Sequence, residues 1–110
     1  MSPNLDQLFK ALANIHRRKI IYSLSLQPHS ISQLASSRLL SLPAIYKHIK
    51  LLEAAALITR KKIGQTNFLS LNRQALHLIQ RWLMQYHPYW GNNQESLKNY
   101  SKYLKGGEKK

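Results

Sequence analysis

The chain contains no cysteine and few acidic residues, and each shortage excludes a class of chemistry. Without thiols there is no disulfide, no thiolate nucleophile and no thiolate metal site. The four acidic residues are Asp6, Glu53, Glu95 and Glu108, and none stands in a spacing with histidine that suggests a nucleophile and its base. The sequence therefore predicts a protein that is not an enzyme and that carries no cofactor.

Long apolar runs are missing as well. No stretch is long enough to cross a bilayer, and no charged segment followed by an apolar one opens the chain, so we expect neither a membrane partner nor secretion. A chain of 110 residues has room for one domain with a modest core. We expect that domain over residues 1–105 and a disordered basic tail over 106–110.

Positive charge is what the chain has in excess. Seventeen Lys and Arg residues give it a net charge of +13. Self-repulsion of this size destabilises a compact chain, so a polyanionic partner is the natural explanation. Nucleic acid is favoured over an anionic membrane surface because no segment has the strongly basic amphipathic pattern of a helix that lies on membranes.

Helical periodicity dominates the first quarter of the chain. Apolar residues at helical spacing predict one helix over 5–13 and a second over 17–26, separated by a break. The first helix is too short to be stable alone, so its apolar face must be buried by another element. That face consists of Leu5, Leu8, Phe9 and Leu12.

Two further helices follow in a helix-turn-helix pattern. Ser30 and Gln33 form a capping box that opens the third helix. Ser41 is a good N-cap for a fourth helix over 41–55, and Pro43 falls in its first turn, where a missing N–H costs nothing. Two helices joined by a short turn, the second opening on an N-cap, are typical of this DNA-binding motif.

The fourth helix divides into an apolar back and a polar front. Its apolar stripe comprises Ile45, Ile49 and Leu52, and its opposite face carries Tyr46, Lys47 and Lys50. A short helix with a basic, hydroxyl-bearing front fits the major groove of DNA. The alternative is an ordinary surface helix, because exposed lysine often does no more than keep its charge in water.

A β-hairpin is expected after the fourth helix. Residues 58–63 and 66–71 are rich in β-branched or apolar side chains and flank Gly64 and Gln65. Basic and hydrogen-bonding residues surround the tip, which predicts a DNA-binding wing. The alternative is a solubilising edge hairpin, since lysine also protects sheet edges.

A broad apolar helix and a shorter one complete the predicted fold. Asn72 caps a helix over 73–86, and a last helix is expected over 95–104. The apolar stripe of the former is wider than one small core requires, which favours a subunit interface over a central core helix. The stripe contains Leu76, Leu78, Ile79, Trp82, Leu83 and Tyr86. The predicted fold is mainly α with a small β-hairpin, a winged helix-turn-helix ordered α-α-α-α-β-β-α with a short C-terminal helix.

These segments resemble the arsenical-resistance-repressor (ArsR-like) winged-helix family over residues 5–86. Five segments carry the resemblance in the family's order and spacing: 8–14, 16–21, 31–35, 41–58 and 68–71. The resemblance implies a homodimeric prokaryotic transcription regulator, usually a repressor, that is cytoplasmic and associated with the nucleoid. It also implies double-stranded DNA as partner and leaves any small-molecule effector unknown.

The resemblance and the helix faces together give two sets of candidate residues. The expected DNA-binding residues are Ser41, Pro43, Ala44, Tyr46, Lys47, His48, Lys50, Arg60, Lys61, Lys62 and Gln65. The expected dimer interface pairs the first and fifth helices through Leu5, Leu8, Phe9, Leu12, Leu76, Ile79, Trp82, Leu83 and Tyr86. If about six phosphates are neutralised, log affinity should fall against log salt with a slope near −5.

The chain departs from the family where relatives bind metal. Ser30 and Ser32 occupy the positions of the family's thiolate ligands. His77 and His87 are present, but no Asp or Glu occurs between Glu53 and Glu95 to join them as a ligand. Zinc prefers about four N, O or S ligands, so we expect no metal site. We interpret both histidines as surface or core residues that bind no metal.

Three other departures concern single positions. Ile15 stands where Pro is frequent, Gln65 where Arg is frequent, and Ala56 where Gly commonly closes the recognition helix. A left-handed Ala56 would cost roughly 1 kcal/mol relative to Gly.

Two other functions remain open from the sequence. An architectural protein that coats DNA without a preferred site would share the charge but read no sequence. A winged-helix protein-interaction module would use the aromatic C-terminal segment 87–104. That segment is expected to cap the dimer, with a small-molecule pocket at Tyr89, Trp90, Tyr100 and Tyr103 as the alternative.

Overall fold

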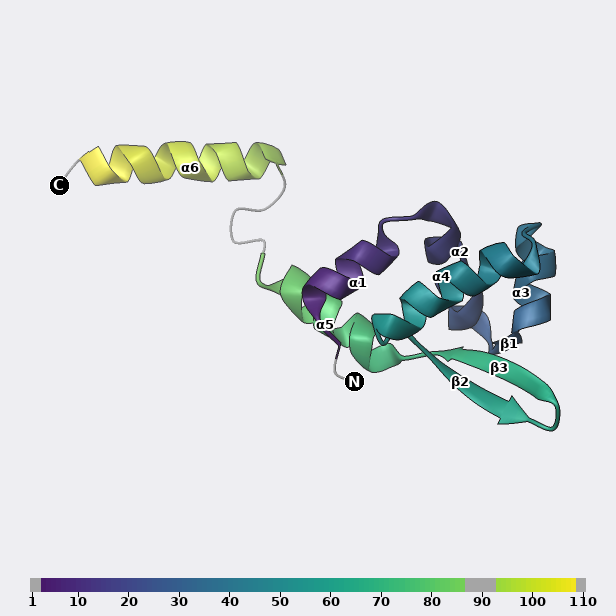
Figure 1. Cartoon of the computed structure of the whole chain (residues 1–110). Helices are drawn as coiled ribbons and strands as arrows, with labels where there is room; N and C mark the ends of the chain where they lie inside the picture. Colours follow the sequence, from purple (N-terminus) through teal and green to yellow (C-terminus); the bar gives the residue numbers. More distant parts are fainter. Residues whose placement is uncertain (1–2, 87–92, 109–110) are drawn as a thin grey trace. The chain divides into compact units, whose positions relative to one another are not determined.

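The computed structural model describes residues 3–86 and 93–108, in a mainly helical winged helix-turn-helix fold (Figure 1). The elements in chain order are α1 (Leu5–Leu12), α2 (Ile15–Leu26), β1 (His29–Ser30), α3 (Ile31–Arg38), α4 (Leu42–Ala54), β2 (Ile58–Ile63), β3 (Thr66–Leu71), α5 (Arg73–Met84) and α6 (Asn93–Glu108). They form two compact units, Met1–Ile79 and Gln80–Lys110. The single domain expected over 1–105 stays a prediction.

Asparagine caps begin the first two helices. The Asn4 side chain accepts hydrogen bonds from the N–H groups of Asp6 and Gln7, at 2.9 and 3.2 Å. Asn14 does the same for His16 and Arg17, again at 2.9 and 3.2 Å. The predicted start of the second helix at residue 17 was therefore wrong, because the cap places it at Ile15.

The helix-turn-helix is confirmed as α3 and α4. Ser30 and Gln33 form the predicted capping box, and Ser41 caps α4 with Pro43 in its first turn. Between the helices the chain turns at Leu39, whose backbone is left-handed at φ 55° and ψ 38°. The turn is closed by the N–H of Leu40, which donates to the Ala35 carbonyl at 3.0 Å.

The sheet has three antiparallel strands in the order β1-β3-β2. The β2–β3 hairpin is the predicted one, and it projects away from the helices of its unit (Figure 1). The two-residue β1, which pairs His29 with Leu69 and Ser30 with Phe68, was not expected. Ser30 therefore serves as a strand residue and as the N-cap of α3.

One apolar core holds the first unit together. Its fully buried large side chains come from α1, α2, α3, α4, the segment before β2, and β3, and they are Leu8, Ile20, Leu34, Ile45, Ile49, Leu52, Leu57 and Leu69. All three inward residues predicted for α4 are among them. The back of α4 is therefore fixed against the rest of the unit, which determines the face that it turns to solvent.

The second unit contains the end of α5 and the whole of α6. Helix α5 ends at Met84, two residues before its predicted end. Helix α6 was expected over 95–104 but runs from Asn93 to Glu108, so residues 106–108 are helical and do not belong to a disordered tail. The predicted aromatic contacts of Tyr89 and Trp90 lie outside the described residues. None of the described helices is both long and apolar enough to cross a membrane.

Candidate nucleic-acid interface

The exposed side of α4 carries most of the residues predicted to contact DNA. Tyr46 is 47% exposed, and Lys47 and Lys50 are exposed beside it. Ser41 and Pro43 are also exposed, whereas the predicted Ala44 and His48 are half-buried. The opposite side of the helix is buried in the core, so this polar face is what α4 offers to a partner.

The first turn of α4 has few free polar groups. The Ser41 hydroxyl oxygen accepts a hydrogen bond from the Ala44 N–H at 3.3 Å, and Pro43 has no N–H. Ser41 therefore acts first as a helix cap. Its hydroxyl hydrogen remains available as a donor.

His48 is held by Arg17 from α2. The Arg17 guanidinium donates to the Ala11 carbonyl at 2.6 Å, and its Nη1 lies 3.3 Å from His48 Nδ1. Arginine has no acceptor, so Nδ1 must accept, and the proton of the neutral ring then lies on Nε2. Thirty-one residues separate the two side chains, so no periodicity in the sequence could reveal this contact.

The surroundings of His48 favour its neutral form. Partial burial, the Arg17 charge and the nearby His16 ring, whose centroid is 5.5 Å away, all lower the pKa of His48 below its usual 6.5. The side chain is therefore a neutral Nε2 donor near pH 7. It can donate a hydrogen bond to DNA but adds no positive charge there.

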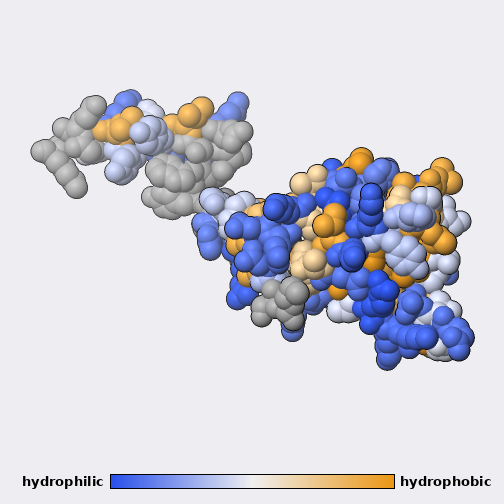
Figure 2. Space-filling model, viewed as in Figure 1, coloured by the Kyte–Doolittle hydropathy of each residue, from blue (hydrophilic) through white to orange (hydrophobic). Residues whose placement is uncertain are grey.

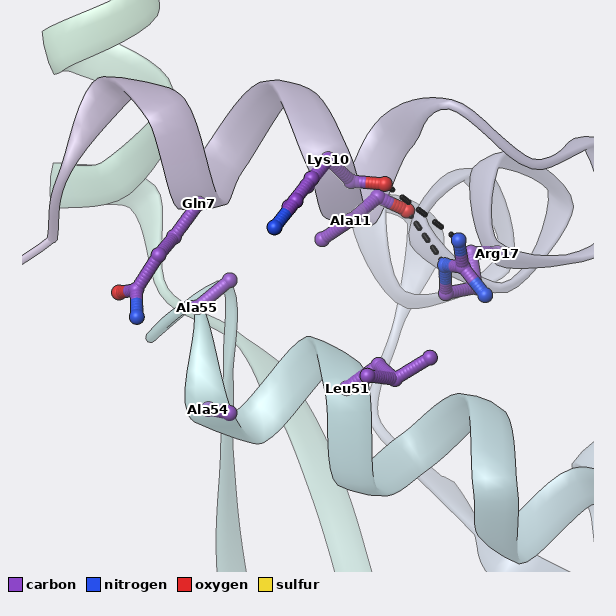
Figure 3. A pocket seen from close by; sticks show the side chains of 7 residues that line it. All are labelled: Gln7, Lys10, Ala11, Arg17, Leu51, Ala54 and Ala55. Atoms are coloured by element: carbon purple, nitrogen blue, oxygen red, sulfur yellow. Dashed lines mark hydrogen bonds between the residues drawn. The ribbon is translucent and has the colours of Figure 1, made fainter.

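A pocket of about 420 Å³ lies between α1 and α4 (Figure 3). Gln7 and Lys10 of α1 face the C-terminal end of α4 across it, and Leu51 closes the side nearer Arg17. Arg17 is already engaged there by the carbonyl oxygens of Lys10 and Ala11. The pocket uses none of the residues predicted to contact DNA.

The β2–β3 register divides the basic residues of the wing between two faces. Lys61 pairs with Phe68 and Lys62 with Asn67, so the two lysines point to opposite sides of the hairpin. The loop is Gly64 and Gln65, and Gly64 has the positive φ of 62° that the tight turn needs. Lys61, Lys62 and Gln65 are all exposed, and Figure 2 shows hydrophilic residues covering the hairpin end.

Arg60 is placed differently from the other wing residues. Its guanidinium donates to both carboxylate oxygens of Glu53, at 2.7 and 3.3 Å, and thereby joins the base of the wing to the end of α4. Its partner in β3 is the buried Leu69, so it lies far from the tip. This partly exposed ion pair links the wing to the end of α4 and could not be foreseen from the sequence.

Comparisons with known proteins agree with this geometry. The sequence model described as "Bacterial regulatory protein, arsR family" matches residues 16–60. The uncharacterised HTH-type transcriptional regulator YuzN of Bacillus subtilis is 33% identical over 91 residues, which are 76% of this chain and 99% of that protein. The chain belongs to the ArsR family of bacterial regulatory proteins.

Solved structures of ArsR-family regulators share the fold. An ArsR-like transcriptional regulator from Rhodococcus sp. RHA1 has a TM-score of 0.74 at 26% identity, with 90% of this chain and 91% of that chain covered. The homodimeric winged helix-turn-helix DNA-binding domain Mb0332 from Mycobacterium bovis has a TM-score of 0.61 at 19% identity, with 81% of this chain and 89% of that chain covered. The family match and the relative YuzN, and not these structures, identify this ArsR-family chain as a transcriptional regulator that binds DNA.

The residues predicted for the dimer interface of this ArsR-family regulator differ in exposure. Leu8 is completely buried in the core of its own unit and offers no exposed surface there. Phe9 is 38% exposed, and in the second unit Leu83 and Tyr86 are exposed by 55% and 67%. The remaining predicted residues are half-buried: Leu5, Leu12, Leu76, Ile79 and Trp82.

The resemblance implies metal ligands at certain positions of the family. In this chain the residues at those positions have other surroundings. Ser30 Oγ accepts the Gln33 N–H at 3.1 Å as a helix cap, and Ser32 is exposed. Within residues 3–86 and 93–108, no three histidine or acidic side chains are close enough to hold a metal ion. His77 is exposed on α5, and His87 lies outside the described residues.

Proposed function

We propose that this ArsR-family chain is a homodimeric, sequence-specific regulator of transcription that acts as a repressor. One observation carries the proposal: the back of α4 is buried at Ile45, Ile49 and Leu52, while Tyr46 and Lys47 are exposed on its front. A helix held in this way can insert a fixed set of side chains into the major groove. Tyr46 and Lys47 are the residues that read bases, and His48 donates through Nε2 to a base or a phosphate.

The wing supplies affinity to this interaction. Lys61, Lys62 and Gln65 contact the phosphate backbone or the minor groove, and Lys50 on α4 contacts a base or phosphate. Contacts to phosphate fix the position of the protein on the duplex but carry little sequence information. The net charge of +13 supports this role, since unlike charges steer the protein to DNA.

The dimer is supported by exposed apolar surface and by a relative. Phe9, Leu83 and Tyr86 expose apolar area, and a contact with a second copy would remove it from water. The Mycobacterium bovis neighbour of the same fold is described as homodimeric. In a dimer the two α4 helices enter successive major grooves, about one helical turn apart. Bound upstream of a gene, such a dimer covers promoter DNA and thereby represses transcription.

Fluorescence anisotropy tests the proposal directly. The protein is titrated at ~150 mM salt with the DNA upstream of its own gene and with a scrambled duplex. We expect a preference of about a thousandfold for the upstream DNA, in the range of specific regulators. Lys47→Ala should reduce that preference, whereas the same change at the exposed Lys19 of α2 should leave it intact.

Equal, strongly salt-sensitive binding to both duplexes would overturn the proposal. That outcome would instead favour a protein that coats DNA, which the excess of positive charge would also suit. Binding to neither duplex would point to a protein partner. Transcription in vitro from the bound promoter then decides whether binding represses or activates.

A further inference from the structure

Two leucines lie exposed at the beginning of the recognition helix. Leu39, in the turn between α3 and α4, is 93% exposed, and Leu42, the first residue of α4, is 49% exposed. Figure 2 shows hydrophobic residues at the surface over the end of the first unit where α3 passes into α4. We refer to Leu39 and Leu42 as the apolar edge.

The apolar edge is unfavourable for the free protein in two ways. Leucine side chains are normally removed from water, and Leu39 also holds a left-handed backbone at φ 55°, which L-residues with a side chain rarely adopt. Asparagine or glycine would suit that backbone better. The stability of the free protein therefore does not explain a leucine at this position, whereas a contact with a partner would.

The two residues that follow Leu42 cannot read bases through hydrogen bonds of their own. Pro43 has no N–H, Ala44 has only a methyl group, and the Ala44 N–H already donates to the Ser41 hydroxyl oxygen. The first polar side chain that follows is Tyr46, one turn after Leu42 on the same side of the helix. The residues at the N-terminus of a recognition helix are those that meet base edges, and here the three that follow the Ser41 cap are apolar.

Thymine is the base that suits such a surface. In the major groove its C5-methyl is the apolar group that an aliphatic side chain can contact, whereas the other features of the base edges are hydrogen-bond donors and acceptors. We propose that Leu42, supported by Leu39, selects thymine at defined positions of each half-site by packing against the C5-methyl group. This rests on the proposed function, because it requires α4 in the major groove.

Replacing thymine with deoxyuridine tests the proposal without changing the protein. Deoxyuridine keeps every hydrogen-bonding group of thymine and lacks only the methyl group. A preferred duplex is first selected by the wild-type protein from a random pool, and each thymine in it is then replaced singly. We expect one or two replacements in each half-site to weaken binding about fourfold, the factor for removing one buried methyl-sized group from an apolar contact.

Variants of the apolar edge assign the effect to its residues. Leu42→Ala should bind the thymine and deoxyuridine duplexes equally at one sensitive position, and Leu39→Asn should weaken the discrimination there or at the adjacent thymine. Leu51→Ala is the matched control, because Leu51 lies on the same helix and is 51% exposed but belongs to the other end of α4. Leu51→Ala should retain the wild-type ratio of affinities for the thymine and deoxyuridine duplexes. Circular dichroism and thermal unfolding verify that all three variants fold.

The outcomes separate this inference from the function on which it rests. If selection yields no preferred duplex, the proposed function fails and no base is read. If a preferred duplex is found but no thymine is sensitive to loss of its methyl group, only the inference is overturned. It is also overturned if the full sensitivity persists in Leu42→Ala, because a residue other than Leu42 would then contact the methyl group.

Discussion

Backbone conformation at a single residue sets part of the stability of this chain. Ala56 ends the recognition segment with φ 60°, a conformation that costs an L-residue with a side chain roughly 1–2 kcal/mol. Ala56→Gly removes that cost but gains unfolded-state entropy, so we expect a net increase of about 0.5–1 kcal/mol in the free energy of unfolding. Urea denaturation measures it. Ala56→Val should destabilise the protein, and the same sign for both variants would contradict the explanation.

The ionisation of His48 makes folding stability depend on pH. Burial, Arg17 and His16 lower its pKa in the folded state, so between that lowered pKa and 6.5 the unfolded state binds more protons. The stabilising contribution is complete above pH 6.5 and is lost as the pH falls through this window. We expect His48→Gln, which can still accept from Arg17, to show a smaller loss of stability between pH 7.5 and 5.5 than the wild type. The free energy of unfolding of both proteins is measured by urea denaturation across that range. An equal loss in the two proteins would refute this assignment.

At the scale of residues, the sequence predicts what depends on near neighbours in the chain. The Ser41 cap and the effect of Ala56 follow from positions relative to a helix end, and both were foreseeable. The contact of Arg17 with His48 spans 31 residues and depends on how α2 packs on α4. The ion pair of Arg60 with Glu53 depends likewise on the angle of the hairpin.

Among the elements, α4 combines a structural and a functional demand at its N-cap, Ser41. Removing the cap by Ser41→Ala should lower the free energy of unfolding by ~1 kcal/mol. Ser41→Asp keeps a good cap and complements the helix dipole, so its stability should match the wild type. Its carboxylate would nevertheless face phosphate, and DNA affinity should fall more than in Ser41→Ala. Denaturation and anisotropy on the same samples compare the two effects.

The wing should act on all DNA sequences alike. Lys61 is exposed and shares its face of the hairpin with Phe68, without a carboxylate partner in the described part of the chain. Lys61→Ala should therefore weaken binding to specific and scrambled duplexes by the same factor and reduce the salt slope by about 0.9 for each protomer, or about 1.8 for the dimer. The control is Lys19→Ala on α2, with the same change in charge. An effect of Lys61→Ala confined to the specific duplex would make Lys61 a base-reading residue.

Element order was predictable because each helix and the hairpin has its own pattern, but element ends were not. Residues 15–16 belong to α2 because Asn14 caps it, although their sequence shows no apolar periodicity and predicts a break. The strand β1 has only two residues, too few for any periodicity, and exists through pairing with β3. Helix α6 includes Gly106, a residue with low helix propensity, which explains why its predicted end came too early.

For the whole molecule, the number of chains determines how much DNA is covered. Phe9→Asp places a charge in the proposed dimer interface, and we expect a protein of half the mass by light scattering, because burying an unpaired carboxylate is costly. Tyr22→Asp is the control: Tyr22 is 66% exposed on α2, outside the proposed interface. If both variants keep the wild-type mass, Phe9 is not part of the interface.

Salt dependence then connects assembly to DNA binding. Each neutralised phosphate contributes about −0.9 to the slope of log affinity against log salt, so about six contacts give a slope near −5 for the dimer. Half of those contacts belong to each protomer. A monomeric Phe9→Asp protein should therefore bind with a slope near −2.5 and lose the preference for the full site, while Tyr22→Asp keeps both. If the monomer kept the full slope, a single chain would supply all the phosphate contacts. The model with one α4 helix from each protomer in successive major grooves would then be wrong, even if dimers form in solution.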